Sequence, residues 1–162
     1  MLTPWYVLHL RPRTEKKVAE HCTRLRLTHY LPLRRETKIY QRRKVTVEKP
    51  VFPGYLFLSM DREGRLAVLK TNHVVRIMEP MSRRALLHQL AQVRRALRVD
   101  PGLIAASGLR KGRRVRITGG PFMGIEGVVS EVKGMTRVSL NVEIVGQSVA
   151  VVVDPGFLEV AD

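Results

Sequence analysis

In the stretch KPVFPGYLFLSM, residues Lys49–Met60, six large apolar side chains surround a Pro-Gly pair. Such a run predicts a central β-strand. Pro53 lacks a backbone N–H group and Gly54 tolerates a sharp bend, so we expect the strand to be entered through a kink. Alternation divides the apolar side chains between two faces, with Phe52, Leu56 and Leu58 on one and Val51, Tyr55 and Phe57 on the other. The protein's own helices can cover one face, and the second is either further core or a surface for a partner.

The positive charge of the chain is concentrated in its first hundred residues. The 162 residues include 29 Lys and Arg against 14 Asp and Glu, a formal net charge of +15. Residues 1–100 carry 22 basic and 8 acidic side chains, a net of +14, whereas residues 101–162 carry 7 and 6, a net of +1. Arg outnumbers Lys, and the planar guanidinium group matches phosphates and base edges. The composition therefore favours nucleic acid as a partner of the first hundred residues.

Cysteine content and hydropathy predict the compartment. Cys22 is the single cysteine, so no internal disulfide can form and a reducing compartment is expected. The apolar run after Met1 is short and has no basic segment before it, which argues against a signal peptide. No window is long enough to span a membrane. We expect a cytoplasmic protein without membrane contact, and a monomer, because no apolar helix face is left over.

A strand at Trp5–Leu10 is expected to lead into a helix that begins after Thr14 as N-cap and runs to about Leu27. Val18, Cys22 and Leu25 form the apolar face of this helix. A group of basic side chains lies at the strand end and along the adjacent flank of the helix: Arg11, Arg13, Lys17, His21 and Arg24. We call these five residues the basic ridge. It is either a phosphate-binding surface or an ordinary solvated face.

The segment Leu31–Pro50 alternates apolar and charged residues on both sides of Gln41-Arg42. This pattern predicts a long β-hairpin whose tip carries Arg42, Arg43 and Lys44. The arm is either a nucleic-acid contact or an edge protected by its charge. Downstream, a short helix within 61–71, a strand at 73–79 and a helix at 82–98 complete an α+β fold, with helices on an antiparallel sheet.

The composition changes between Val99 and Leu109, where the chain becomes small and nearly uncharged. We expect a domain at 1–98, a linker at 99–109 and a second domain at 110–162. The last segment has valine-rich strands separated by glycines, which predicts a small all-β barrel. Within it, Gly127 is expected to form a β-bulge that lets the barrel curl.

The segment Lys111–Val129, KGRRVRITGGPFMGIEGVV, resembles a KOW motif, a motif of small SH3-like barrels. The residues that carry this likeness are Gly112, Val115, Ile117, Gly120, Gly124 and Gly127. Together with the Trp5-Tyr6 strand and the Phe52-Pro53-Gly54-Tyr55 strand, the chain resembles the transcription elongation and antitermination factors NusG and RfaH over nearly its whole length.

The resemblance implies an amino-terminal NusG-type (NGN) domain that binds the clamp helices of RNA polymerase and suppresses pausing or termination. The polymerase-binding residues would be Phe52, Pro53, Tyr55 and Phe57. The basic ridge would contact the non-template DNA strand, and His9 or His21 would supply a flat surface for a base. The KOW domain would recruit a small-subunit ribosomal protein or the termination factor Rho. RfaH can hold this domain as a helical hairpin, but the Val and Gly content here predicts a β-barrel.

Two departures from the family pattern favour a specialised, RfaH-like paralog. Asn72-His73 replaces the Gly-Val pair usually found before the fourth strand. In the barrel, Ile144–Gln147 lacks the aromatic and arginine side chains that housekeeping NusG usually has there.

Enzymatic function has little support. The five histidines have no metal-ligand spacing, and Cys22 has no evident base, so we expect neither a catalytic centre nor a cofactor or metal. A nuclease would need clustered acidic residues, and those of the first hundred residues are scattered. The remaining alternative is a ribosome-associated or RNA-binding KOW protein, which would be expected to have a basic barrel.

Overall fold

The residues after the Pro53-Gly54 pair form strand β5 (Tyr55–Ser59), the aromatic strand. It is an inner strand of a four-stranded antiparallel sheet in the order β2-β5-β1-β6. The computed structural model describes residues 3–161. The neighbouring strands are β2 (His29–Tyr30), β1 (Trp5–Leu10) and β6 (Val74–Met78). β5 pairs with β1 from Trp5–Ser59 to His9–Tyr55. The predicted central strand is confirmed, whereas the two-residue strand β2 was not predicted.

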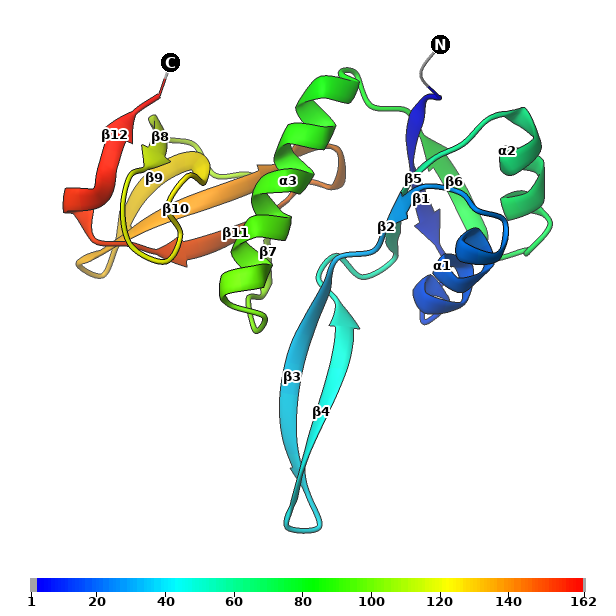
Figure 1. Cartoon of the computed structure of the whole chain (residues 1–162), viewed down its shortest axis with the longest axis horizontal. Helices are drawn as coiled ribbons and strands as arrows, with labels where there is room; N and C mark the ends of the chain where they lie inside the picture. Colours follow the sequence, from blue (N-terminus) through cyan, green and yellow to red (C-terminus); the bar gives the residue numbers. More distant parts are fainter. Residues whose placement is uncertain (1–2, 162) are drawn as a thin grey trace. The chain divides into compact units, whose positions relative to one another are not determined.

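One face of this sheet is covered by helices α1 (Glu15–Arg24) and α2 (Arg62–Leu69) (Figure 1). The core between them consists of fully buried side chains from both layers: Leu8, Leu10, Val18, Cys22, Leu56, Leu58, Met60 and Val68. Leu56 and Leu58 therefore face the helices, as alternation predicts. Asp61 caps α2, because its carboxylate accepts a 2.8 Å hydrogen bond from the Gly64 N–H group.

The ends of α1 differ from the prediction. Thr14 precedes the helix, but its hydroxyl donates to the Arg11 carbonyl oxygen at 2.7 Å instead of capping the helix. The helix ends at Arg24, three residues before the predicted end. Arg26 adopts a left-handed conformation (φ 58°), and the Leu27 N–H group donates to the Cys22 carbonyl oxygen at 2.9 Å. This bond closes a Schellman motif, which terminates the helix.

Alternation fails at Phe52. This residue was predicted to share a face with Leu56 and Leu58, but its ring contacts Phe57 edge-to-face, with centroids 6.2 Å apart. The reason is the turn at Pro53-Gly54, where Gly54 has a φ of 89° and the Tyr55 N–H group donates to the Phe52 carbonyl oxygen at 3.1 Å. Because this turn interrupts the extended backbone, the period of two does not continue across it.

The predicted hairpin is confirmed as strands β3 (Leu33–Tyr40) and β4 (Arg43–Pro50), which form a twisted two-stranded sheet of their own (Figure 1). The register is continuous from Leu33–Pro50 to Tyr40–Arg43. The two residues of the turn, Gln41 and Arg42, both have positive φ angles, 48° and 67°. Such a pair of central residues is the mark of a type I′ turn.

Helix α3 (Arg83–Val99) is joined to the carboxy-terminal segment by two glutamine side chains. The Gln92 side-chain oxygen accepts a 2.9 Å hydrogen bond from the Glu126 N–H group, and that of Gln89 accepts a 3.0 Å bond from the Glu143 N–H group. Leu86, Leu90 and Val93 are buried, whereas Leu97 is only half-buried.

The carboxy-terminal strands form a six-stranded antiparallel sheet in the order β12-β8-β9-β10-β11-β7. Its strands are β7 (Ala105–Ser107), β8 (Arg114–Ile117), β9 (Glu126–Val132), β10 (Met135–Val142), β11 (Gln147–Val152) and β12 (Leu158–Val160). The short helices η1 (Glu143–Val145) and η2 (Pro155–Phe157) lie between the last three. This segment is therefore built from strands, as predicted, and part of the expected linker contributes β7, which pairs with β11.

The chain divides into two compact units, each built from two separate segments of the sequence. Among the described residues, the first unit comprises those up to Pro32 together with Phe52–Arg84, and the second comprises Leu33–Val51 and those from Ala85 onward. The hairpin and nearly all of α3 thus belong with the carboxy-terminal sheet. None of the helices within residues 3–161 is long and apolar enough to cross a membrane.

Candidate nucleic-acid interface

Helix α1 and the segment that leads into β6 come together because of the pairing of β1 with β6. The register of these strands ends at Leu10–Val74, so the start of β6 lies beside the end of β1, where the chain turns into α1. The Arg11 N–H group donates to the His73 carbonyl oxygen at 2.8 Å. The sheet therefore brings residues more than sixty positions apart in the sequence to one place.

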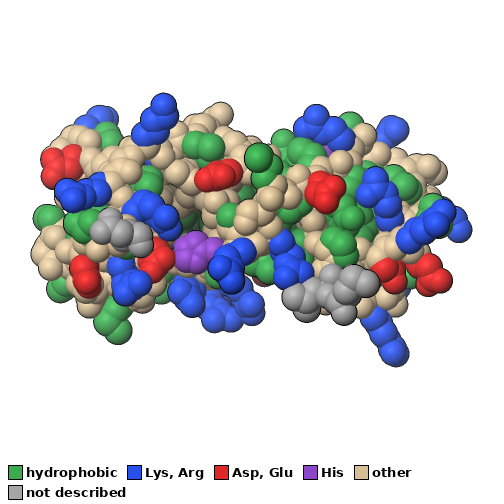
Figure 2. Space-filling model, turned by 90° about the horizontal axis from the view of Figure 1, so that it is seen from above, with side chains coloured by type: hydrophobic (Ala, Val, Ile, Leu, Met, Phe, Trp, Pro, Cys, Tyr) green, Lys and Arg blue, Asp and Glu red, His purple; other side chains and the backbone are tan. Residues whose placement is uncertain are grey.

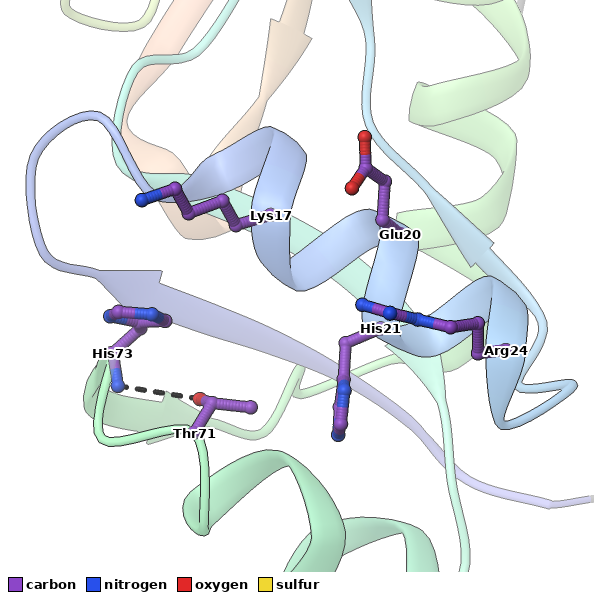
Figure 3. A pocket seen from close by; sticks show the side chains of 6 residues that line it. All are labelled: Lys17, Glu20, His21, Arg24, Thr71 and His73. Atoms are coloured by element: carbon purple, nitrogen blue, oxygen red, sulfur yellow. Dashed lines mark hydrogen bonds between the residues drawn. The ribbon is translucent and has the colours of Figure 1, made fainter.

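A pocket of about 330 Å³ opens at this place (Figure 3). Its lining residues are Lys17, Glu20, His21 and Arg24 of α1, with Thr71 and His73 from the segment between α2 and β6. In Figure 3, the His21 side chain extends from α1 toward that segment, and the Glu20 carboxylate points to the other side of the helix. Three residues of the basic ridge, Lys17, His21 and Arg24, thus share one concave surface.

Hydrogen bonds hold the segment opposite α1. The Thr71 hydroxyl donates to the Val68 carbonyl oxygen at 2.7 Å, which anchors the segment to the end of α2. The same hydroxyl oxygen accepts a 3.3 Å hydrogen bond from the backbone N–H group of His73. Asn72 has a left-handed backbone (φ 62°), which turns the chain sharply between Thr71 and His73. The backbone of His73 is therefore held on both sides, by the Thr71 hydroxyl and by the Arg11 N–H group.

The pocket combines fixed positive charge with flat rings. Lys17 and Arg24 are exposed basic side chains, whereas His21 and His73 are half-buried and present imidazole rings. Cations that follow a sugar-phosphate backbone, with rings on which bases stack, characterise sites for single-stranded nucleic acid. Lys and Arg side chains are also spread widely over the molecular face in Figure 2.

The other two members of the basic ridge do not line the pocket. Arg11 and Arg13 are both exposed in the connection between β1 and α1, and Arg13 has a φ of 65°. Sequence reasoning missed Glu20, Thr71 and His73 as pocket residues. A signal for the last was present, because Asn72-His73 departs from the family pattern at this point.

The predicted polymerase-binding residues are not equally accessible. Phe52 and Phe57 are 1% and 0% exposed, Pro53 is exposed, and Tyr55 is half-buried. The Tyr55 ring stacks on His9, with centroids 5.2 Å apart and planes inclined by 19°. Of these four residues, only Pro53 and Tyr55 are accessible for direct contact with a partner.

A buried carboxylate connects the aromatic strand to α1. Glu15, the first residue of α1, is 7% exposed, and its Oε2 atom accepts a 3.0 Å hydrogen bond from the Gly54 N–H group. The Leu10 N–H group donates to the Gly54 carbonyl oxygen at 2.7 Å. These bonds connect the Pro53-Gly54 turn to the first residue of α1 and to the last residue of β1.

The residues of the KOW-like motif form a strand, a turn and a second strand. Val115 and Ile117 are buried side chains of β8. Gly120 and Gly124 have positive φ angles of 77° and 94° in the turn that follows. Gly112 faces the backbone of Val129 so closely that a Cβ atom would overlap the carbonyl oxygen.

The expected bulge at Gly127 is not seen toward β8, where Gly127 pairs with Val115 in a regular register, and the pairing of β9 with β10 ends one residue earlier, at Val128–Ser139. A Cβ atom there would lie 2.6 Å from the Ser139 carbonyl oxygen and 2.7 Å from Val138 Cγ1. Close approach of the adjacent strand is therefore the reason for glycine at this position.

An ion cluster lies where β8 and β9 meet α3. Arg116 donates to Glu126 Oε1 at 2.8 and 3.0 Å, and His88 Nε2 lies 3.3 Å from Glu126 Oε2. The Arg116 hydrogen bonds hold the pKa of the Glu126 carboxyl below its ordinary value, against the opposing effect of burial. Within residues 3–161, His, Cys, Asp and Glu side chains form no cluster of three or more that could hold a metal ion.

Comparison with known proteins places this geometry in a family. Residues 3–96 match the family model described as "Transcription termination factor nusG". The chain is 29% identical to the Transcription termination/antitermination protein NusG of Deinococcus radiodurans, in an alignment covering 95% of this chain and 97% of that protein. The solved structure "Domain interaction in Thermotoga maritima NusG" shares the fold, with a TM-score of 0.52 and 20% identity, over 99% of this chain and 98% of that one. Because the family model spans more than half of the residues, the chain belongs to the NusG family of transcription factors.

Proposed function

We propose that this protein is a transcription elongation or antitermination factor that binds the clamp helices of RNA polymerase and contacts the non-template DNA strand. The observation that carries the proposal is the pocket that joins the cations of α1 to the rings of His21 and His73. Family membership supplies the process, transcription. The pocket supplies a physical reason for contact with an exposed DNA strand.

The proposed DNA contact uses both properties of the pocket. Lys17 and Arg24 neutralise phosphates, and the release of counterions favours binding at low salt. The His21 and His73 rings offer surfaces for an unpaired base, and stacking of this kind contributes about 1–3 kcal/mol per base. Arg11 and Arg13 extend the positive surface beyond the pocket.

The proposed polymerase contact is the surface of the aromatic strand. Pro53 and Tyr55 would touch the clamp helices, and the buried pair Phe52 and Phe57 would hold this surface in shape from beneath. The stack of Tyr55 on His9 and the hydrogen bond from Gly54 to Glu15 support such a role, because they limit the movement of the contact residues before binding.

The carboxy-terminal segment would act as a KOW barrel that recruits a further partner, either a small-subunit ribosomal protein or Rho. In this proposal residues 1–98 form the polymerase-binding domain, 99–109 the linker and 110–162 the KOW domain. The mechanism is tethering, which requires only that the protein bind the elongating polymerase more tightly than the paused one. A difference of about 1–3 kcal/mol would change pausing at least about fivefold.

The DNA contact is tested by fluorescence anisotropy with a short labelled single strand and the full chain. The variant Lys17→Gln/Arg24→Gln should bind more weakly, and its salt slope should fall by about 0.7 for each lost phosphate contact. His73→Ala should also weaken binding, because a ring surface for base stacking is lost. The control Arg94→Gln/Arg98→Gln removes the same charge from exposed positions of α3. Equal losses in the pocket and control variants would refute a specific site.

The polymerase contact is tested by co-precipitation of the full chain with purified core polymerase. Tyr55→Ala should lose most of the bound polymerase, whereas the matched control Tyr40→Ala, at an exposed hairpin position, should keep it. Circular dichroism spectra would verify that both variants are folded. Full retention of polymerase by folded Tyr55→Ala would contradict the proposed contact surface.

A further inference from the structure

We infer that the tip of the β3–β4 hairpin is a second nucleic-acid surface, one that enters a groove of double-stranded DNA. This inference goes beyond the proposed function, in which the protein contacts only single-stranded DNA. It rests on that function only in supposing that DNA is nearby. The observations concern the charge of the tip, its exposed side chains, its turn and its dimensions.

The distal half of the hairpin carries a net positive charge. Between Thr37 and Val47 there are four cationic side chains and no Asp or Glu: Lys38, Arg42, Arg43 and Lys44. The acidic residues of the hairpin, Glu36 and Glu48, are closer to its base. Glu36 is already engaged there, with Lys49 Nζ at 2.6 Å and Lys38 Nζ at 3.8 Å. The net attraction for a polyanion is therefore concentrated at the tip.

Large apolar side chains also lie exposed at the tip. Ile39 is 76% exposed and Tyr40 is 69% exposed. The register places Tyr40 opposite Arg43 on one face of the ribbon and Ile39 opposite Lys44 on the other. Each face thus presents one apolar side chain beside one cation. This pairing suits a groove, in which apolar groups meet base edges and cations reach the flanking phosphates.

The two central residues of the turn are not those that would stabilise it most, and both carry long side chains. A type I′ turn requires positive φ at both central residues, for which Asn-Gly is the preferred pair. The chain has Gln41 and Arg42 instead, each in a left-handed conformation that non-glycine residues rarely adopt. Unfavourable backbone conformations of this kind are retained where the side chain has a use. Here they place an arginine at the outermost point of the arm.

The dimensions of the arm favour duplex DNA. Each strand has eight residues, which corresponds to an arm of roughly 27 Å. The major groove, about 12 Å wide and about 8.5 Å deep, admits a two-stranded β-ribbon. A groove of this depth takes the turn and roughly the last two residues of each strand. These are the residues Ile39 to Lys44, in which the exposed apolar groups and three of the cations are gathered.

The test measures binding of the full chain to a short labelled DNA duplex by anisotropy over a range of salt concentrations. In the variant Arg42→Gln/Arg43→Gln/Lys44→Gln, duplex affinity should fall about tenfold or more, and the salt slope should decrease by about 2 to 3. The control Arg94→Gln/Arg95→Gln/Arg98→Gln makes the same change in net charge on α3 and should have much smaller effects. Equal losses in both variants would overturn the inference, because only the overall charge would then matter.

A second variant separates side-chain display from hairpin folding. Gln41→Asn/Arg42→Gly installs the preferred turn pair, so thermal stability should be kept or raised, yet duplex affinity should fall because Arg42 is lost. Unchanged affinity would overturn a role for the outermost arginine. A loss confined to single-stranded DNA or to an RNA duplex would overturn the assignment to duplex DNA.

The same variants distinguish this inference from the proposed function. The tip variants should keep both polymerase co-precipitation and single-strand binding in the pocket, whereas Lys17→Gln/Arg24→Gln should keep its duplex affinity to within the effect of the control. If Tyr55→Ala loses polymerase binding, the proposed function is supported. If the tip variant nevertheless keeps its full affinity for duplex DNA, the inference about the hairpin is refuted.

Discussion

Replacement of Gly127 by alanine places a methyl group between two paired strands of the carboxy-terminal sheet. The new Cβ atom would lie 2.6 Å from the Ser139 carbonyl oxygen, 2.7 Å from Val138 Cγ1 and 3.0 Å from Leu140 Cδ2. Ordinary carbon–oxygen contacts between strands are about 3.3–3.6 Å, so the strands would have to separate locally by roughly 0.7–1 Å. The nearest atom belongs to the backbone, which cannot move away by a simple change of rotamer.

The expected cost follows from two opposing effects. Overpacking of a well-packed site destabilises by about 1–3 kcal/mol, with this backbone clash toward the upper end. Alanine also restricts the unfolded chain, which returns about 0.4–1 kcal/mol. The net loss should be about 2 kcal/mol, and at a urea dependence of about 2 kcal/mol per molar the midpoint should fall by roughly 1 M.

The assay is urea unfolding followed by the amide NMR signals of β9 and β10, which report on this sheet alone. Gly102→Ala is the matched control, because its Cβ would have ordinary contacts, 3.5 Å from Asp100 Oδ1 and 3.7 Å from the Arg35 carbonyl oxygen. The control should unfold at the wild-type urea concentration or slightly above it. A midpoint for Gly127→Ala that equals that of Gly102→Ala would refute the close-approach explanation.

Three further predictions follow from buried or paired groups. Glu15→Ala should lower the free energy of unfolding by about 1–3 kcal/mol, because the Gly54 N–H group loses its acceptor; urea unfolding followed by Trp5 fluorescence measures this, and an unchanged midpoint would contradict it. Burial raises the pKa of Cys22 to about 11, so at mildly alkaline pH the thiol should resist alkylation until urea is added, and rapid labelling of the folded protein would contradict this. The folded pKa of Glu126 lies below its unfolded value, so its ion pair stabilises the protein above that unfolded value, about 4.5, and this contribution is lost as the pH falls through the folded pKa. Arg116→Gln should reduce this acid-dependent loss of stability, and an unchanged pH profile of thermal unfolding would contradict the assignment.

Local patterns in the sequence were sufficient for most elements and for the family. Alternation predicts β1, β5 and the hairpin, and helical spacing predicts α3, because these periodicities depend only on neighbouring residues. The identification as a NusG-family protein is confirmed by the family match. The preference for a specialised, RfaH-like paralog stays a prediction.

Three features of the molecule depended on its tertiary structure. The turn at Pro53-Gly54 rotates Phe52 away from the face that alternation assigns to it. Gly127 is glycine because a neighbouring strand approaches closely, and no pattern along β9 reveals the distance to β10. The glutamine side chains of α3 accept hydrogen bonds from backbone groups more than thirty residues away.

Three residues of the basic ridge, Lys17, His21 and Arg24, could be grouped from the sequence, because spacings of four and three place them on one flank of any helix. That this flank forms a pocket with Thr71 and His73 depends on the tertiary structure. That pocket exists because β1 and β6 pair in a register that brings the start of β6 to the end of β1. Strand pairing of this kind joins residues far apart in the chain, and the periodicity of a single segment carries no information about which distant segment it will meet.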